Sequence, residues 1–182
     1  HKFNKKDHIL TVIPLFHVGG LNIQTIPALH KGAQVTLHKK FEINDTLKDL
    51  EKSIYTHTVF VPTILDLLVN NKKWDAKIFS SLKAITTGST IVSSDLIKNY
   101  EDYKIPILQV YGSTETAPIA ICQKISEDRS PFGNVGKIAK YNKAKIFNKA
   151  HRETSLNTIG EIGIKGLNLF SYYWNDKNKT KQ

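Results

Sequence analysis

The sequence contains no methionine, even at its first position, and only one cysteine among its 182 residues. Natural chains begin with methionine, so we expect an internal piece of a longer protein. The single cysteine, Cys122, excludes an intrachain disulfide and is typical of a reducing compartment, which favours a cytoplasmic location. No apolar run approaches the roughly 18 residues that a membrane-spanning helix needs. The sequence therefore predicts no membrane span, and it leaves peripheral association with a membrane open.

Acidic residues are few: 16 Asp and Glu stand against 26 Lys and Arg, which gives a net charge of +10. A strongly basic domain can bind nucleic acid. Here the lysines are scattered along the chain and few aromatic residues lie between them, which favours a solvated basic surface. We therefore expect no nucleic-acid partner. The hydrophobic content of 40% is sufficient for a sizeable core.

Strand-like and helix-like segments alternate as far as Val110. This order predicts an α/β fold with a largely parallel sheet flanked by helices. The expected strands lie at 9–13, 34–37, 58–61, 82–86 and 105–110. The expected helices lie at 17–30 with a kink or an earlier end at Pro27, from a cap at Asn44 or Asp45 to about Ile54, from Pro62 onward, and at 95–100 after a cap at Ser93 or Ser94.

One turn carries the strongest chemical signal. The apolar run at 105–110 leads directly into Tyr-Gly-Ser-Thr-Glu at 111–115. Ligands of open α/β sheets bind where strands end. The tyrosine offers a flat face for a base, and the glycine allows close approach of the backbone. The two hydroxyls can donate to a phosphate, and the carboxylate is an oxygen ligand of the kind Mg²⁺ takes beside phosphates. The plain alternative is a turn with an exposed acid.

Three blocks together resemble the adenylate-forming enzymes, which include acyl-CoA synthetases, peptide-synthetase adenylation domains and luciferases. The run at 111–115 resembles their Tyr-Gly-x-Thr-Glu motif. Residues 14–20, Pro-Leu-Phe-His-Val-Gly-Gly, are similar to their Pro-x-Phe-His segment. Residues 160–166, Gly-Glu-Ile-Gly-Ile-Lys-Gly, are similar to a third motif and are followed by Tyr172-Tyr173-Trp174-Asn175. The match in order extends from about Ile9 to Asn175, and Gly-Asn-Val-Gly-Lys at 133–137 fits a further stretch.

The resemblance implies site residues for ATP, Mg²⁺ and a carboxylic acid. Thr114 and Glu115 would be catalytic, and Glu115 would be the Mg²⁺ ligand. The nucleotide would be bound by Gly88, Ser89, Thr90, Gln109, Val110, Tyr111, Gly112, Ser113 and Thr114. The acyl pocket would include Phe16, His17, Gly19 and Gly88. In the loop at 87–90 only Gly88 matches the family pattern.

The resemblance also implies a reaction and a division of the chain. The parent would form an acyl-adenylate from a carboxylic acid and ATP, release pyrophosphate, and pass the acyl group to coenzyme A (CoA). Residues 1–125 would be the second subdomain of the large N-terminal domain, and 126–182 the start of a small β subdomain. A phosphate loop before His1, a ribose-binding Asp after Gln182 and a C-terminal lysine would lie outside the chain, so we expect the isolated chain to be inactive.

Several alternatives stay open. The Pro-Leu-Phe-His segment favours a CoA ligase, with a fatty or o-succinylbenzoate-type acid preferred over an aryl acid. A fatty acyl-AMP ligase and a peptide-synthetase-type adenylation domain are the alternatives within the family. A non-catalytic nucleotide- or nucleic-acid-binding α/β domain is the alternative from another class. The sequence does not fix the oligomeric state.

The last third of the chain has a different character. Short strands are expected at 144–147, 161–165 and 169–172, with a polar hairpin-like loop at 151–157. Tyr173 and Trp174 are assigned to packing. His57 has no partner in the sequence for a metal site, and we interpret it as structural.

Overall fold

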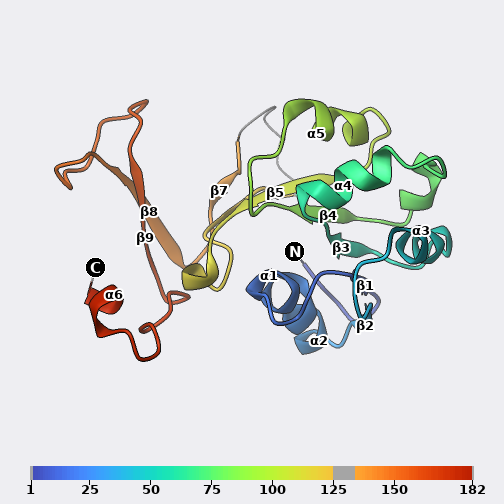
Figure 1. Cartoon of the computed structure of the whole chain (residues 1–182), viewed down its shortest axis with the longest axis horizontal. Helices are drawn as coiled ribbons and strands as arrows, with labels where there is room; N and C mark the ends of the chain where they lie inside the picture. Colours follow the sequence, from blue (N-terminus) through green and yellow to red (C-terminus); the bar gives the residue numbers. More distant parts are fainter. Residues whose placement is uncertain (1, 125–133, 182) are drawn as a thin grey trace.

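A computed structural model describes residues 2–124 and 134–181. Its main feature is a seven-stranded sheet in the order β2-β1-β3-β4-β5-β6-β7 (Figure 1). The first five strands in that order pair in parallel and the last two pair antiparallel, so the predicted α/β fold is confirmed. The strands are β1 (His8–Thr11), β2 (Gln34–Leu37), β3 (His57–Val59), β4 (Ala84–Thr87), β5 (Ile107–Tyr111), β6 (Ile121–Cys122) and β7 (Lys137–Ile138).

Helices cover both faces of this sheet (Figure 1). One segment runs without a break through α1 (Val18–Gly20), the π-helix η1 (Leu21–Thr25) and α2 (Ile26–His30). The other helices are α3 (Ile43–Glu51), α4 (Pro62–Val69), the 3₁₀ helix η2 (Ala76–Phe79), α5 (Ser94–Glu101), the 3₁₀ turn η3 (Thr114–Thr116) and α6 (Lys177–Lys181). The larger core cluster lies between the sheet and α3, α4 and α5, and a smaller cluster joins β1 to α2.

Local signals explain most helix boundaries. The Ser93 side chain accepts a hydrogen bond from the Leu96 amide at 3.2 Å, which confirms it as the cap of α5. Pro62 occupies the first turn of α4, as predicted. Pro27 does not end the first helical segment, because it lies in the first turn of α2, directly after the π segment. Helix α3 begins at Ile43 after Glu42 and has no side-chain cap, so the predicted cap at Asn44 or Asp45 is wrong: both residues lie inside the first turn of the helix.

The strands beyond β5 were predicted less well. The antiparallel pair β6 and β7 was missed, and no strand forms at 169–172 within the described part of the chain. Strands β8 (Asn142–Phe147) and β9 (Glu161–Gly166) form a separate two-stranded hairpin, as the sequence predicted for 144–147 and 161–165. The division at residue 125 stays a prediction, and β7 belongs to the main sheet.

A buried polar network joins the amino ends of three neighbouring strands. Asp7 precedes β1, His57 begins β3 and Lys83 precedes β4. The Asp7 Oδ1 atom lies 2.6 Å from the Lys83 Nζ and 3.9 Å from the His57 Nδ1. The Thr56 hydroxyl lies 3.0 Å from the same imidazole nitrogen. Asp7 and His57 are 1% and 3% exposed, so this network holds His57 within the fold, as the structural interpretation predicted.

We expect the free energy of unfolding to decrease as the pH falls from 6.5 to about 4, the range between the pKa values of His57 in the unfolded and the folded chain. Burial lowers the pKa of His57 from 6.5 to about 4, although the Asp7 carboxylate opposes the shift. Below pH 6.5 the unfolded chain binds a proton at His57 that the folded chain does not, so stability falls until the pH nears 4. At about 1.4 kcal/mol per pKa unit, the total loss is on the order of 3 kcal/mol. Urea denaturation at a series of pH values measures it.

Two histidine-to-glutamine variants check this expectation: His57→Gln is the test and His30→Gln is its matched control. His57→Gln should flatten the pH dependence, whereas His30→Gln, at the exposed end of α2, should retain it. His8, whose pKa burial also lowers, contributes with the same sign in every variant. If His57→Gln does not fold, an NMR titration of the His57 ring in the unsubstituted chain gives the same information. A midpoint near 6.5 in that titration would contradict the expectation.

Candidate functional site

A cleft of about 400 Å³ lies at the carboxyl ends of β4 and β5. The two strands pair in parallel with Thr87 opposite Gln109, so the loops that follow them meet at one edge of the sheet. Seven of the predicted nucleotide-binding residues line this cleft: Gly88, Ser89, Thr90, Gln109, Val110, Tyr111 and Gly112. The sequence therefore predicted which residues come together here. Their binding of a nucleotide stays a prediction.

Two glycines allow the backbone to pack tightly around the cleft. A Cβ atom on Gly88 would lie 2.6 Å from the Val110 carbonyl oxygen. A Cβ atom on Gly112 would lie 1.6 Å from the Pro118 carbonyl oxygen. Both distances are far below a van der Waals contact, so only glycine fits. Ser89 adopts a left-handed conformation with φ of 75°, a strained backbone state that often marks ligand sites.

Thr114 and Glu115 do not line the cleft but form the 3₁₀ turn beside it. The turn is held by Thr116, whose hydroxyl accepts from the Ser113 amide at 2.8 Å and donates to the Pro118 carbonyl at 2.8 Å. These local bonds fix the backbone of η3 immediately after the carboxyl end of β5. The predicted catalytic pair thus lies on a rigid turn at the rim of the cleft.

The Glu115 carboxylate is hydrogen-bonded by neutral donors. The Tyr173 hydroxyl donates to the Glu115 Oε1 atom at 2.7 Å. This bond, followed by one from the Ser113 side chain, lowers the pKa of Glu115. The carboxylate is therefore an anion at neutral pH. Sequence reasoning missed Tyr173, because its position in the aromatic run at 172–175 gives no hint of a partner 58 residues earlier.

The metal prediction fits a site with few protein ligands. Within residues 2–124 and 134–181 no group of three or more His, Cys, Asp and Glu side chains could hold a metal ion. Mg²⁺ retains several waters and is commonly bound by one or two carboxylates together with substrate phosphates. An anionic Glu115 at the rim of the cleft suits that mode of binding.

The predicted acyl-pocket residues lie on a different element, except for Gly88. His17 is the residue before α1, and its ring lies 6.1 Å from the Phe16 ring. Phe16 is 89% exposed, and a Cβ atom on Gly19 would contact only the side chains of Ile13 and Ile23. These three residues follow β1 at the same edge of the sheet as the cleft, and none of them is among its described lining residues. Their role in an acyl pocket stays a prediction.

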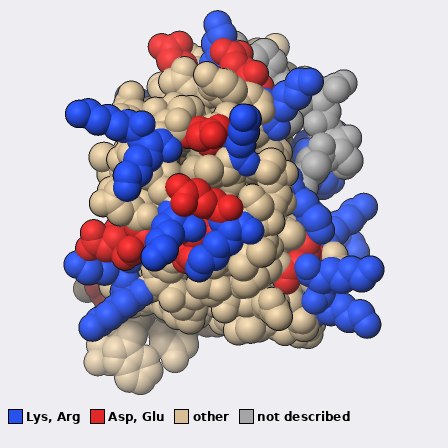
Figure 2. Space-filling view, turned by 90° about the vertical axis from the view of Figure 1, so that its right-hand side faces the viewer, with Lys and Arg blue, Asp and Glu red and all other residues tan. Residues whose placement is uncertain are grey.

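Charge on the opposite side of the molecule is mixed. Figure 2 views the side of Figure 1 that lies away from η3, and it shows Lys and Arg side chains with Asp and Glu between them. Several lysines form ion pairs with acids, among them Lys40 with Glu42 at 2.5 Å.

The part of the chain that the structure describes contains no helix long and apolar enough to span a membrane.

Comparison of the sequence with known proteins finds one matching family and several similar CoA ligases. Residues 1–174 match the family described as AMP-binding enzyme. An indoleacetate–CoA ligase from Aromatoleum aromaticum is 42% identical over 97% of this chain and 34% of its own length. A 2-succinylbenzoate–CoA ligase from Enterococcus faecalis is 30% identical over 97% of this chain and 36% of its own length. The chain therefore spans about a third of the length of the curated relatives it matches.

Structural comparison gives the same fold. Apo MatB from Rhodopseudomonas palustris superposes with a TM-score of 0.90 at 24% identity, over 99% of this chain and 35% of that chain. The o-succinylbenzoate CoA synthetase MenE from Bacillus subtilis, solved with ATP and a magnesium ion, has a TM-score of 0.85 at 25% identity. It is matched over 99% of this chain and 37% of that chain.

Proposed function

Because the chain belongs to the AMP-binding enzyme family, we propose that it is the adenylate-binding part of a carboxylate–CoA ligase. The observation that carries this proposal is the arrangement at the edge of the sheet. Seven predicted nucleotide-binding residues from two neighbouring strand ends line one cleft, with the Thr114–Glu115 turn at its rim. The activity belongs to the whole protein, in which an acid and ATP would give an acyl-adenylate and pyrophosphate, and CoA would then take the acyl group.

The residues of the turn would act by positioning and by charge. Tyr111, 39% exposed at the cleft, presents a ring on which the adenine can stack. Thr114 offers a hydroxyl and an amide to the α-phosphate, and the rigid turn holds both in place. Mg²⁺ bound at Glu115 would neutralise charge on the phosphates during attack by the acid. Such groups, fixed before the substrate arrives, are the main source of rate enhancement in this kind of transfer.

We propose an aromatic carboxylic acid as the substrate. Relatives that match the chain include ligases named for indoleacetate, ferulate, 4-coumarate and 2-succinylbenzoate, and these four acids carry an aromatic ring. The 42% identity to the indoleacetate–CoA ligase favours an arylacetic acid. This proposal departs from the expectation from sequence alone, which preferred a fatty or o-succinylbenzoate-type acid over an aryl acid.

The test is ATP–pyrophosphate exchange by the complete protein that contains this chain. Indole-3-acetate, 4-coumarate, 2-succinylbenzoate and decanoate would each be supplied, followed by CoA. We expect exchange that depends on the acid, at least about tenfold faster with the best aromatic acid than with decanoate, since a misfitting side chain costs 1–3 kcal/mol in such pockets. CoA should then yield a thioester.

The outcomes separate the alternatives. Exchange without thioester formation would indicate an acyl-AMP ligase, and exchange with amino acids alone would indicate a peptide-synthetase-type domain. No exchange with any acid, together with retained nucleotide binding, would contradict the ligase and support a binding domain. The 182-residue chain by itself is expected to give no exchange, because it spans only about a third of its relatives.

The same proposal includes the partners and the location. Small-molecule carboxylic acid, ATP and CoA would be the partners, with no nucleic acid. A cytoplasmic location is consistent with the single cysteine.

A further inference from the structure

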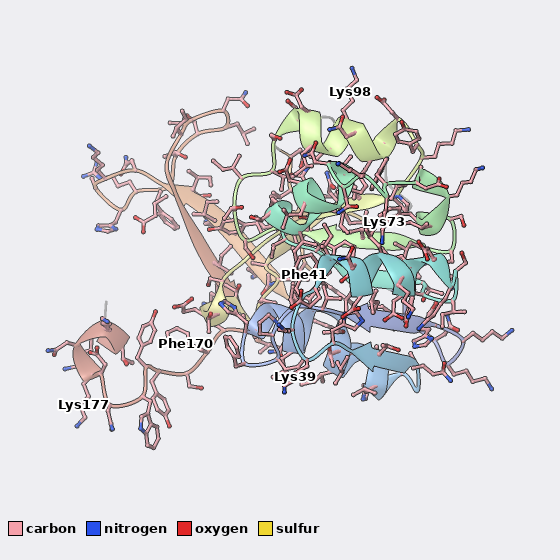
Figure 3. The ribbon with its side chains drawn as sticks, turned by 45° about the vertical axis from the view of Figure 1, so that its right-hand side comes forward. Lys39, Phe41, Lys73, Lys98, Phe170 and Lys177 are labelled. Carbon is pink, nitrogen blue, oxygen red and sulfur yellow. The ribbon has the colours of Figure 1, made fainter. Side chains whose placement is uncertain are left out.

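The segment that follows β9 crosses the η3 turn and binds it at three points. The Asn168 side-chain amide donates to the Thr116 carbonyl at 2.5 Å. The Phe170 amide donates to the Glu115 carbonyl at 2.9 Å. The Tyr173 hydroxyl donates to the Glu115 carboxylate at 2.7 Å. Figure 3 shows Phe170 beside the turn. We call residues 168–173 the strap.

Tyr173 is itself held in place by the strap and by α6. Its ring packs edge-on against the Phe170 ring, with centroids 4.6 Å apart. Its amide donates to the Thr180 hydroxyl at 3.0 Å. The phenol is therefore fixed at its backbone and along its ring. A donor fixed in this way can select one orientation of the carboxylate that it bonds.

The Glu115 carboxylate receives hydrogen bonds without losing its charge. Within the described part of the chain no lysine or arginine forms an ion pair with it, and its hydrogen-bond donors are neutral: the hydroxyls of Tyr173 and Ser113 and the backbone amide of Glu115 itself. A cationic donor such as lysine would orient the carboxylate but neutralise it. A neutral phenol orients it and leaves its full negative charge for a divalent cation. Metal-ligating carboxylates commonly have such neutral supporting donors.

We propose that Tyr173 is a positioning residue that fixes the orientation of the Glu115 carboxylate toward a Mg²⁺–nucleotide bound at the end of β5. This role rests on the proposed function, since it requires a nucleotide in the cleft. In this role of Tyr173, the strap would connect the β8–β9 hairpin to the metal ligand Glu115. Tyr173 would act only through Glu115 and would not touch the reacting atoms.

The test measures metal binding instead of turnover. Mn²⁺ would be titrated by electron paramagnetic resonance into the complete protein saturated with α,β-methylene-ATP. Tyr173→Phe should weaken Mn²⁺ binding about tenfold, because loss of a supporting donor typically lowers metal affinity by 10- to 100-fold. Tyr172→Phe is the matched control: Tyr172 is adjacent and 58% exposed, and its substitution should leave the affinity unchanged.

A double-variant cycle shows whether Tyr173 acts through Glu115. In a Glu115→Gln background, the further change Tyr173→Phe should have little effect on Mn²⁺ affinity, because the negative charge that binds the metal is already removed. Equal Mn²⁺ affinity in the unsubstituted protein and Tyr173→Phe would overturn the role of Tyr173, and a lower melting temperature alone would make the strap purely structural. Absence of Mn²⁺–nucleotide binding in the unsubstituted protein would instead overturn the proposed function, and the role of Tyr173 with it.

Discussion

Replacing Glu115 by glutamine in the complete protein is expected to slow acid-dependent ATP–pyrophosphate exchange by about 100-fold. Loss of one preorganised electrostatic group in a transfer site commonly has an effect of this size. Glutamine keeps the shape of the side chain and its hydrogen bond with Tyr173, but it removes the negative charge. The measurement is the initial rate of exchange at fixed Mg²⁺ and saturating acid.

The control is the same substitution at Glu51, an exposed residue at the end of α3. Glu51→Gln should exchange at the rate of the unsubstituted protein. Raising the Mg²⁺ concentration should restore part of the rate of Glu115→Gln, because weaker metal binding is then compensated by mass action. A Glu115→Gln variant with an unchanged rate at low Mg²⁺ would show that the carboxylate is no metal ligand.

Replacing Gly112 by alanine in the 182-residue chain is expected to lower the free energy of unfolding by about 3 kcal/mol, the upper range for overpacking. The added Cβ would lie 1.6 Å from the Pro118 carbonyl oxygen and 2.8 Å from the Thr116 Oγ1 atom. The carbonyl belongs to the backbone, so relief requires a shift of the turn that Thr116 holds together. Urea denaturation of the two chains at neutral pH measures the difference.

Gly19 provides the matched control for Gly112. A Cβ atom there would lie 3.8 Å from the Ile13 Cδ1 atom and 4.0 Å from the Ile23 Cδ1 atom, which are ordinary contacts. Gly19 lies in α1, where alanine is favoured over glycine by about 0.5–1 kcal/mol. Gly19→Ala should therefore be neutral or stabilising. A loss of less than about 1 kcal/mol for Gly112→Ala would show that the turn yields more easily than its hydrogen bonds imply.

The parallel part of the fold could be predicted from sequence because each signal there is local. Apolar β-type runs, a proline at the start of α4 and a serine before α5 each mark a boundary within a few residues. Strands β6 and β7 gave no such signal, since each is only two residues long. The run at 169–172 resembles a strand by composition, but its amide at Phe170 bonds the turn at Glu115 instead of another strand.

The candidate site was predictable in part for the same reason. Residues at the ends of neighbouring parallel strands must share an edge, so the meeting of Gly88 and Tyr111 in one cleft followed from the strand order. The bond from Tyr173 to Glu115 joins the segment after the β8–β9 hairpin to the turn after β5, and no periodicity in the sequence connects them. Contacts of that kind become visible only when the hairpin and the main sheet are placed together.

The antiparallel pairing of β5 with β6 affects the order in which the site can form. Strands β1 to β5 pair only after the chain has crossed a helix, so each pair closes a long loop. The turn at 112–120 is closed instead by Tyr111 and Ile121, which face each other across a single reversal of the chain. Once β5 joins the sheet, the turn that carries Thr114 and Glu115 can assemble from its own neighbours, without waiting for any further crossover.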